Sequence, residues 1–443
     1  MRILIIGQGG REHAIAWKLS LSDRVSHVFV CPGNGGTALE DNITNVNIDE
    51  KHHSNLIKFA KEEHIDLTIV GPEAPLVDGL VNSFQDANLN IFGPTKEFSI
   101  LEGSKAFSKK FMKDNAISTA DFQEFSDIHK AEKFCQSTTF PKVLKADGLA
   151  AGKGVIICQN LDEALSALNE LFNSKSHSKI VIEDFIVGQE LSAIYICNFR
   201  GPTYEICLPW TKDYKSRDEY NSGPNTGGMG AVSHPILENH KNTIFKNHIA
   251  IEKLLSKTIV AINDIMKRTK QNYVGFLYLG LMITKRDIKI LEYNCRSGDP
   301  ETQNLMMNLH NNEIDLLDLI ENNPLSKTRD LNIIDIDSKK NYVCTIVLAA
   351  KGYPGNYEKD FFLDISQVNQ SKSLKIFHSG TKLINKKIKS IGGRILSINT
   401  YSENKDECIR LAYENIKKIR VFKDEEMTDE DSGLVFFRED IGQ

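Results

Sequence analysis

The stretch Lys145–Val155 reads KADGLAAGKGV, and it carries the main clue to the fold because it nearly matches a Walker A phosphate loop. A Walker A loop needs G-x-x-x-x-G-K-[ST], whose amides surround the phosphates while the final hydroxyl binds magnesium. Here Gly148 and Gly152 are one residue too close. Lys153 is followed by Gly154, where Ser or Thr is required. The stretch is therefore either a phosphate-binding loop of another kind or an ordinary glycine-rich turn.

Length and composition limit the class of protein. At 443 residues the chain exceeds the roughly 250–300 residues at which one hydrophobic core stops growing, so we expect two or three domains. The 41% hydrophobic and 26% charged fractions are typical of a globular protein. A net charge of -5 gives no footprint for nucleic acid or an anionic membrane, and no apolar run approaches the ~20 residues of a membrane span. We expect neither partner.

The cysteines and the N-terminus predict a cytoplasmic protein. The eight cysteines are scattered without a C-x-x-C pair, which favours neither a zinc ligand set nor a disulfide framework. The opening MRILIIGQGG runs directly into a strand pattern, without a separate apolar segment and a small-residue cleavage site. We therefore predict reduced thiols and no signal peptide.

Residues 1 to about 100 alternate short apolar runs with helical patterns. The strand-like runs are RILIIG (2–7), HVFVCPG (27–33), DLTIVGPE (66–73) and NIFGP (90–94). REHAIAWKL and HSNLIKFAKEEH between them have helical spacing. This alternation predicts an α/β fold with a doubly wound parallel sheet, whose ligands lie beyond the carboxyl ends of the strands.

The pattern changes from about residue 104. After a helical SKAFSKKFMKDN, the runs KVLKADG, GVIIC, KIVIEDFI and ELSAIYIC predict one antiparallel sheet, covered by the helix LDEALSALNELF. A long helix follows at about 239–268, then strands at 276–283 and 288–294, a linker at 322–330 and an α+β remainder. We predict domains at 1–103, 104–325 and 331–443, with a flap subdomain at about 120–190.

The opening GQGGREHA partly matches a dinucleotide-binding fingerprint. Gly7 and Gly9 fit G-x-G-x-x-G, but Glu12 stands at the third position. The second strand ends at Cys31-Pro32, where a ribose-binding acid is required, so a nicotinamide cofactor is disfavoured. The loop leads into a helix N-terminus, which favours an anion such as a substrate phosphate. The alternative is a tight turn without a ligand.

Two later patterns favour a nucleotide and a metal. Lys105 and Lys145, with the glycine loop, supply fixed positive charge for a triphosphate, although each lysine alone is more often a solvated surface charge. Glu292 and Asn294 lie two apart on a strand and share a face, which suits magnesium held partly by phosphate oxygens and water. The alternative is a polar strand face, but the apolar flanks make a lone buried Glu costly.

Two further stretches give weaker signals for ligand binding. VIEDFIVGQE (181–190) is an apolar strand that breaks at an acidic pair and offers a slot for adenine, with Glu190 available to a ribose. Exposed acids at strand ends are nevertheless common. SGPNTGGMGA (222–231) allows a backbone to approach a small substrate closely, or forms a hairpin turn.

Together these features resemble the ATP-grasp superfamily, and within it the phosphoribosylamine–glycine ligase (glycinamide ribonucleotide synthetase) family. The matching stretches span residues 7–442: GQGGREHA, PGNGGTA, TIVGPEAPLVDGL, FGPT, LEGSKAF, KADGLAAGKGV, GPNTGGMGA, GFLYLGLMI, EYNCRSGDPETQ, KGYPG and REDIG. The resemblance implies ligation of glycine to 5-phosphoribosylamine with ATP and Mg²⁺ or Mn²⁺. The products would be glycinamide ribonucleotide, ADP and phosphate, formed through glycyl phosphate in the second step of de novo purine synthesis.

The resemblance also assigns roles by position. ATP binding falls on Lys105, Lys145, Gly148, Gly152, Lys153, Gly154, Glu183, Asp184, Phe185, Ile186 and Glu190. Metal binding falls on Glu292 and Asn294, and a place beside the transferred phosphate on Arg296 and Asp299. The substrate side receives Gly9, Gly10, Gly33, Asn34, Glu73, Asn225, Thr226, Gly227, Gly228, Gly298 and Pro300. No protein nucleophile is needed, because positioning and charge neutralisation accelerate the reaction.

The chain departs from the family pattern at a few positions. Relatives often read DHKR where this chain has Asp213-Tyr214-Lys215-Ser216, an aromatic residue at Ser297 and Gly at Lys351. These departures concern the local shape of the substrate loop. The chain ends after DIGQ, which predicts a single-function form, and we expect a monomer.

Three other functions remain as alternatives. An ATP-grasp enzyme using formate or bicarbonate is disfavoured by GPNTGGMGA and GPEAPLVDGL, and a nicotinamide dehydrogenase by the broken fingerprint. A nucleotide-binding regulator without turnover is disfavoured by the intact lysines, Glu292 and Asn294.

Overall fold

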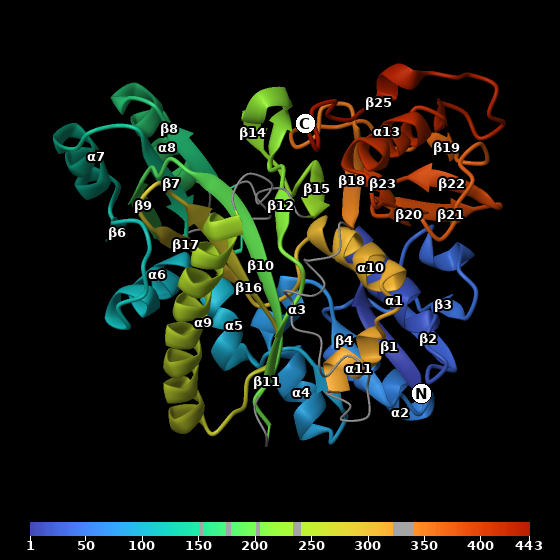
Figure 1. The fold of residues 1–443 in the computed structure, drawn as a ribbon, viewed down its shortest axis with the longest axis horizontal. Helices are drawn as coiled ribbons and strands as arrows, with labels where there is room; N and C mark the ends of the chain where they lie inside the picture. Colours follow the sequence, from blue (N-terminus) through green and yellow to red (C-terminus); the bar gives the residue numbers. More distant parts are fainter. Residues whose placement is uncertain (150–153, 174–178, 201–203, 234–240, 322–340) are drawn as a thin grey trace.

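A computed structural model describes residues 1–149, 154–173, 179–200, 204–233, 241–321 and 341–443 (Figure 1). Its N-terminal part is a five-stranded parallel sheet in the order β3-β2-β1-β4-β5. The strands are β1 (Arg2–Gly7), β2 (His27–Pro32), β3 (Ile43–Asn45), β4 (Leu67–Val70) and β5 (Ile91–Phe92). The predicted doubly wound parallel sheet is confirmed. The sequence did not predict β3, because three residues are too few for a periodic signal.

Helices cover both faces of this sheet. They are α1 (Gly10–Ser20), α2 (His53–Glu62), α3 (Glu73–Asp78), α4 (Leu80–Asp86) and α5 (Lys96–Gly103). Alternate residues of β1 enter different cores: Ile3 and Ile5 pack with α1, whereas Leu4 and Ile6 pack on the opposite side. A strand covered on both faces has to be apolar throughout, which explains the uninterrupted run RILII.

A second, antiparallel sheet runs through the middle of the chain and into its C-terminal part, in the order β17-β16-β10-β12-β15-β18-β23-β20. These strands are β10 (Gln189–Asn198), β12 (Thr211–Asp213), β15 (Gly230–Ser233), β16 (Val274–Ile283), β17 (Ile288–Asn294), β18 (Tyr342–Ala350), β20 (Leu374–His378) and β23 (Arg394–Ser402). β11 (Tyr204–Cys207) pairs with β10, and β25 (Val435–Phe436) with β18. The central and C-terminal parts therefore share one sheet.

The flap is a separate antiparallel sheet in the order β6-β9-β7-β8. Its strands are β6 (Phe122–Phe125), β7 (Lys142–Ala146), β8 (Val155–Cys158) and β9 (Ile180–Asp184), covered by α7 (Ile128–Ser137) and α8 (Leu161–Asn173). The prediction that ELSAIYIC belongs to this sheet is wrong. That segment is β10, which pairs with β16 along its whole length. β10 is buried from Leu191 to Cys197, and the equally long apolar β16 covers it, so a long-range partner outcompetes the local one.

The remaining described elements surround these sheets. The helices are α6 (Lys105–Asp114), α9 (Lys241–Thr269), α10 (Glu301–Asn311), α11 (Leu316–Glu321) and α13 (Lys405–Ile416). A small sheet has the order β21-β22-β19-β24, formed by β19 (Phe362–Asp364), β21 (Thr381–Ile384), β22 (Lys387–Ser390) and β24 (Arg420–Phe422). A hairpin joins β13 (Ser216–Asp218) to β14 (Ser222–Asn225) through the 3-10 turn η2 (Glu219–Asn221).

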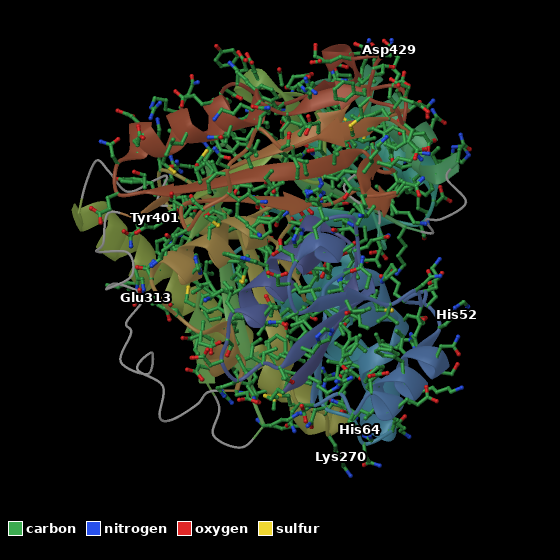
Figure 2. All side chains as sticks on the ribbon, turned by 90° about the vertical axis from the view of Figure 1, so that its right-hand side faces the viewer. His52, His64, Lys270, Glu313, Tyr401 and Asp429 are labelled. Atoms are coloured by element: carbon green, nitrogen blue, oxygen red, sulfur yellow. The ribbon has the colours of Figure 1, made fainter. Side chains whose placement is uncertain are left out.

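The C-terminal part packs directly on the N-terminal sheet domain, as Figures 1 and 2 both show. The main-chain amide of His378 donates to His13 Nδ1 (2.9 Å), and Asn34 Nδ2 donates to the His378 carbonyl (2.8 Å). His13 is thus a buried histidine that packs between the two parts. The predicted linker at 322–330 lies outside the described residues. Among the described helices, none is long and apolar enough to cross a membrane.

Candidate active site

A cavity of about 620 Å³ lies where the flap, the large sheet, the N-terminal domain and the C-terminal part meet. Of the predicted site residues, it is lined by Lys105, Lys145, Gly154, Glu183, Asp184, Phe185, Ile186, Glu190, Glu73, Asn225, Thr226, Gly227, Glu292, Asn294, Arg296 and Asp299. These residues come from positions 73 to 299, so the fold brings most of the predicted set into one space. Gly152 and Lys153 lie outside the described residues.

On the flap side, two lysines share one buried carboxylate. Glu183 on β9 lies 3.0 Å from Lys145 Nζ on β7 and 2.8 Å from Lys109 Nζ on α6. The side chains of all three are less than a tenth exposed. Burial lowers the pKa of Lys109 to about 8, although Glu183 opposes the shift. Glu183 therefore orients both lysines with its side chain.

Lys109 was missed by the sequence reasoning. Its signal is the spacing in SKAFSKKF, because Lys105 and Lys109 are four residues apart and share one face of α6. The neighbouring Asp184 differs from Glu183, since it pairs with Lys142 at a half-exposed position. Phe185 is 37% exposed at the mouth of the cavity.

The start of the glycine loop is tied to the N-terminus of α6. Lys105 Nζ donates to the Gly148 carbonyl (2.8 Å), and burial lowers the pKa of Lys105. The main-chain amide of Ala106 donates to Asp147 Oδ1 (3.1 Å), so the residue after β7 caps the helix. Gly148 has φ of +96°, a conformation that glycine adopts without strain. The loop thus leaves β7 along the cavity wall.

Opposite the flap, Lys215 joins two carboxylates. Its Nζ lies 3.3 Å from Glu190 Oε2 on β10 and 3.5 Å from Glu292 Oε1 on β17. Burial acts to raise the pKa of Glu292, but Lys215, Lys145 and Lys105 together lower it to about 2. Glu292 is consequently anionic at neutral pH, as a ligand of a divalent cation has to be.

Asn294 lies beside Glu292 on the same face of β17. The surrounding acceptors assign the amide nitrogen to the position where it donates to Glu102 Oε1 (3.1 Å) and the Tyr293 carbonyl (3.3 Å), so the amide oxygen takes the opposite position. Within the described residues, no group of three or more His, Cys, Asp or Glu side chains has the arrangement of a complete metal site. Glu292 and Asn294 therefore offer a partial oxygen ligand set.

Arg296 is held between two glutamates. Its Nε lies 3.3 Å from Glu73 Oε2, and its Nη2 lies 3.0 Å from Glu102 Oε1. Burial raises the pKa of Glu102 to about 7. Burial also acts to raise the pKa of Glu73, but the charges of Arg296 and Arg11 outweigh it and lower this pKa to about 2. Glu102, on α5, was not predicted individually, and its only signal was its place in LEGSKAF.

Asp299 is bound by an arginine from the C-terminal part. Arg394 Nη2 lies 3.1 Å from Asp299 Oδ2, and Arg394 Nη1 donates to the carbonyls of Asp299 (2.7 Å) and Gly227 (2.6 Å). Gln303 Nε2 adds a bond to Asp299 Oδ1 (2.8 Å). Arg394 lines the cavity, and nothing in the sequence marked it. It links the two loops that carry the predicted substrate residues.

Asp213 also faces the cavity and was noted only as part of a departure from the family pattern. The residue is partly buried, and its Oδ1 is a buried atom that has no hydrogen-bond partner among the described residues. Burial, together with the nearby Glu301, raises its pKa well above the usual range. A buried acceptor without a donor is costly, so Asp213 is suited to meet a polar group of a ligand.

Several predicted residues do not line the cavity: Gly9, Gly10, Gly33, Asn34, Gly148, Gly228, Gly298 and Pro300. Gly9 donates its amide to Glu12 Oε2 (2.6 Å), so a carboxylate already caps the start of α1. The Asn34 amide nitrogen donates to the carbonyls of Gln8 and His378 (both 2.8 Å). These two residues connect loops in the structure, and their substrate roles stay predictions.

The four residues that depart from the family pattern are neighbours of the cavity lining in the sequence or lie elsewhere, and they do not line the cavity themselves. Of Tyr214, Ser216, Ser297 and Lys351, all of them described, none lines the cavity. Tyr214 is buried in the C-terminal core, where its hydroxyl accepts from the Gly442 amide (3.0 Å). Ser297 is buried and offers its carbonyl to Arg11 (3.1 Å), while Lys351 is exposed.

The flap over paired lysines, facing a carboxylate and an amide on a strand of a large antiparallel sheet, defines an ATP-grasp enzyme. Family comparisons agree: residues 1–102, 103–302 and 343–443 match the N, ATP-grasp (A) and C domains of phosphoribosylglycinamide synthetase. The chain belongs to the phosphoribosylglycinamide synthetase family, and it is an ATP-grasp ligase.

Individual relatives match along the whole chain. The phosphoribosylamine–glycine ligase of Clostridium acetobutylicum is 39% identical over 451 aligned positions, covering 100% of both chains. That of Vibrio parahaemolyticus is 42% identical over 428 positions, covering 95% of each. The crystal structure of the Thermotoga maritima enzyme has a TM-score of 0.78 and 31% identity, covering 100% of both chains. The biotin carboxylase domain of a Hydrogenobacter thermophilus carboxylase shares the fold at 14% identity, with a TM-score of 0.69.

Proposed function

We propose that this cavity performs the reaction for which the relatives are named, the ATP-dependent ligation of glycine to 5-phosphoribosylamine in purine biosynthesis. The observation that carries the proposal is the meeting of Lys105, Lys145 and Glu292 in one enclosed space. A metal-bound polyphosphate needs cations for its phosphates beside an anion for its metal, and this cavity provides both.

ATP would bind between the flap and the large sheet. Lys105 and Lys145 are placed to neutralise phosphate oxygens, the main chain of 183–186 to contact adenine, and Glu190 to accept from the ribose. Gly154 lines the same wall, and Gly148, Gly152 and Lys153 stay assigned to ATP by their positions in the glycine stretch of the sequence. The related Hydrogenobacter domain was solved with MgADP, which supports nucleotide binding at this fold.

Glu292 and Asn294 would hold Mg²⁺ or Mn²⁺. The donor set fits a hard cation, because both side chains present oxygen and Glu292 is anionic. Such a cation supplies Lewis-acid neutralisation of phosphate oxygens. Lys215 lies against Glu292 and Glu190 and supplies positive charge from the protein itself.

The chemistry needs no protein nucleophile. A glycine carboxylate oxygen attacks the γ-phosphorus, the bond to the β-phosphate oxygen breaks, and ADP leaves. The phosphoribosylamine nitrogen then attacks the acyl carbon of glycyl phosphate, phosphate leaves, and the nitrogen loses a proton. Arg296 and Asp299 would lie beside the transferred group, and Asp213 would accept from a substrate N–H. Enclosure protects the acyl phosphate from water.

The substrate-omission assay tests this proposal. ADP should form rapidly only when ATP, glycine and 5-phosphoribosylamine are all present. ADP formation with formate or bicarbonate in place of glycine would instead identify another ATP-grasp reaction. We further propose domains at 1–103, 104–325 and 331–443 and a cytoplasmic monomer, which light scattering of the purified chain would test for oligomeric state.

A further inference from the structure

Arg438 and Asp440, near the C-terminus, form hydrogen bonds with the hairpin β13–β14. Arg438 and Ser216 are 222 residues apart in the chain. Arg438 Nη1 donates to the Ser216 carbonyl (3.0 Å), and Nη2 to Asn221 Oδ1 (3.4 Å). Asp440 Oδ2 accepts from the main-chain amide of Tyr220 (2.9 Å). Figure 1 shows the C-terminus beside β14, in agreement with these contacts. The hairpin β13–β14 is therefore anchored to the C-terminal part.

Arg438 is a rigid anchor. Its side chain is 1% exposed, and its Nε and Nη2 bond to the two oxygens of Asp440 at 2.7 Å and 2.6 Å. Such a two-bond pair fixes the plane of the guanidinium, which a lysine does not reproduce. The guanidinium also lies 5.1 Å from the ring centroid of Tyr214. The donors that remain are directed at the hairpin.

The hairpin needs this anchor because its turn is strained. Tyr220 and Asn221 are consecutive non-glycine residues with φ of 55°, a left-handed conformation that such residues rarely adopt. The Tyr220 side chain is 87% exposed, so packing does little to hold it. Strained turns of this kind persist where surrounding contacts impose them. Here those contacts are the bonds from Asp440 and Arg438.

Both ends of the hairpin reach the cavity. Ser216 directly follows Lys215, whose Nζ lies between Glu190 and Glu292. At the other end, Thr226 donates its amide (2.8 Å) and its hydroxyl (2.7 Å) to the Lys215 carbonyl. Asn225, Thr226 and Gly227 line the cavity. The position of the hairpin therefore sets the position of these groups.

We propose that Arg438, oriented by Asp440, is a positioning residue for the ligation. It holds the hairpin so that Lys215 and the segment 225–227 face the substrates, although it lies outside the cavity lining itself. The inference rests on the proposed function of the cavity. It assigns the segment that follows β25 a part in positioning the side of the cavity opposite the flap.

The test compares Arg438→Gln with Arg410→Gln in the full chain. Arg410 is a matched control on α13, since its side chain is 52% exposed and pairs with Glu407 and Glu414 on the same helix. For Arg438→Gln we expect kcat of ligation to fall roughly 10- to 100-fold, a larger change than in the Kd for ATP, because Lys105 and Lys145 lie on other elements. Trypsin cleavage after Arg217, inside the hairpin, should accelerate in this variant alone.

Other outcomes overturn the proposal. Unchanged kcat and unchanged cleavage would show that the hairpin holds its place unaided. A parallel loss of ATP binding and thermal stability would indicate general unfolding. Arg438→Lys should be as defective as Arg438→Gln, and full activity would refute orientation by the two-bond pair. If Arg438→Gln does not fold, Asp440→Asn replaces it in the same measurements, with the same expected fall in kcat and faster cleavage after Arg217. The cleavage comparison needs no substrate, so it tests the anchoring of the hairpin even if the wild-type chain does not ligate glycine. Failure of the proposed function is therefore distinguishable from failure of this inference.

Discussion

Glu183 Oε2 lies 2.8 Å from Lys109 Nζ, and both side chains are nearly inaccessible to solvent. The other oxygen of Glu183 lies 3.0 Å from Lys145. One carboxylate on β9 thus sets the positions of two cations on different elements, Lys109 on α6 and Lys145 on β7. The phosphate side of the cavity depends on this arrangement.

Replacing Glu183 with Gln should destabilise the protein and weaken ATP binding. The substitution leaves two buried ammonium groups without their anion, and breaking a buried pair costs about 3–5 kcal/mol. Urea denaturation and ATP titration measure the two effects. The control is Asp184→Asn, the next residue, whose half-exposed pair with Lys142 should contribute less than about 1 kcal/mol. Equal losses in the two variants would contradict the role of Glu183.

Stability should fall at acid pH partly because of His378. Burial lowers the pKa of this histidine from 6.5 to about 3. Between these values the unfolded chain binds a proton that the folded chain does not, so stability is lost as the pH falls below 6.5. The loss from this group at pH 5 is about 2 kcal/mol.

His378→Gln should therefore flatten the acid limb of a plot of unfolding free energy against pH. The exposed His52, labelled in Figure 2, provides the control, and His52→Gln should leave the limb unchanged. An acid limb identical in wild type and His378→Gln would assign the loss to other groups.

Replacing Glu292 with Gln should abolish metal-dependent ADP release and leave the fold intact. The substitution keeps the size of the side chain but removes the charge that three lysines hold in place, and we expect turnover to fall roughly 100-fold or more. ADP release at several Mg²⁺ concentrations measures the metal-dependent turnover, and a thermal melt measures whether the fold is intact. Asp287→Asn, in the exposed turn before β17, is the control. Near-normal turnover would refute the metal assignment.

Gly228→Ala should impair the substrate loop. Gly228 has φ of +110°, and a Cβ there would lie 2.4 Å from Pro300 Cδ and 2.8 Å from Asp213 Oδ1. The strain should lower stability by roughly 1–3 kcal/mol and reduce kcat, because Asp213 and the Asp299–Pro300 turn have to move. At the control Gly355, the nearest atom to such a Cβ is 3.3 Å away. Similar melting curves and rates for both variants would contradict this account.

Local patterns in the sequence were enough for much of this molecule. The apolar runs of 2–7, 27–33 and 66–73 predicted parallel strands, because a strand covered on both faces has to be apolar throughout. The glycine loop, the 292–294 pair and the stretches shared with relatives predicted the family, and most of the predicted site residues line the cavity.

Tertiary structure decided what depends on distant partners. Whether ELSAIYIC pairs with the flap or with β16 is a competition between long-range interfaces, and sequence periodicity does not rank them. Lys109, Glu102, Arg394 and Arg438 gain their roles from groups on other elements. The energy of a buried charge depends on the opposite charge it meets, and only the folded chain determines that meeting.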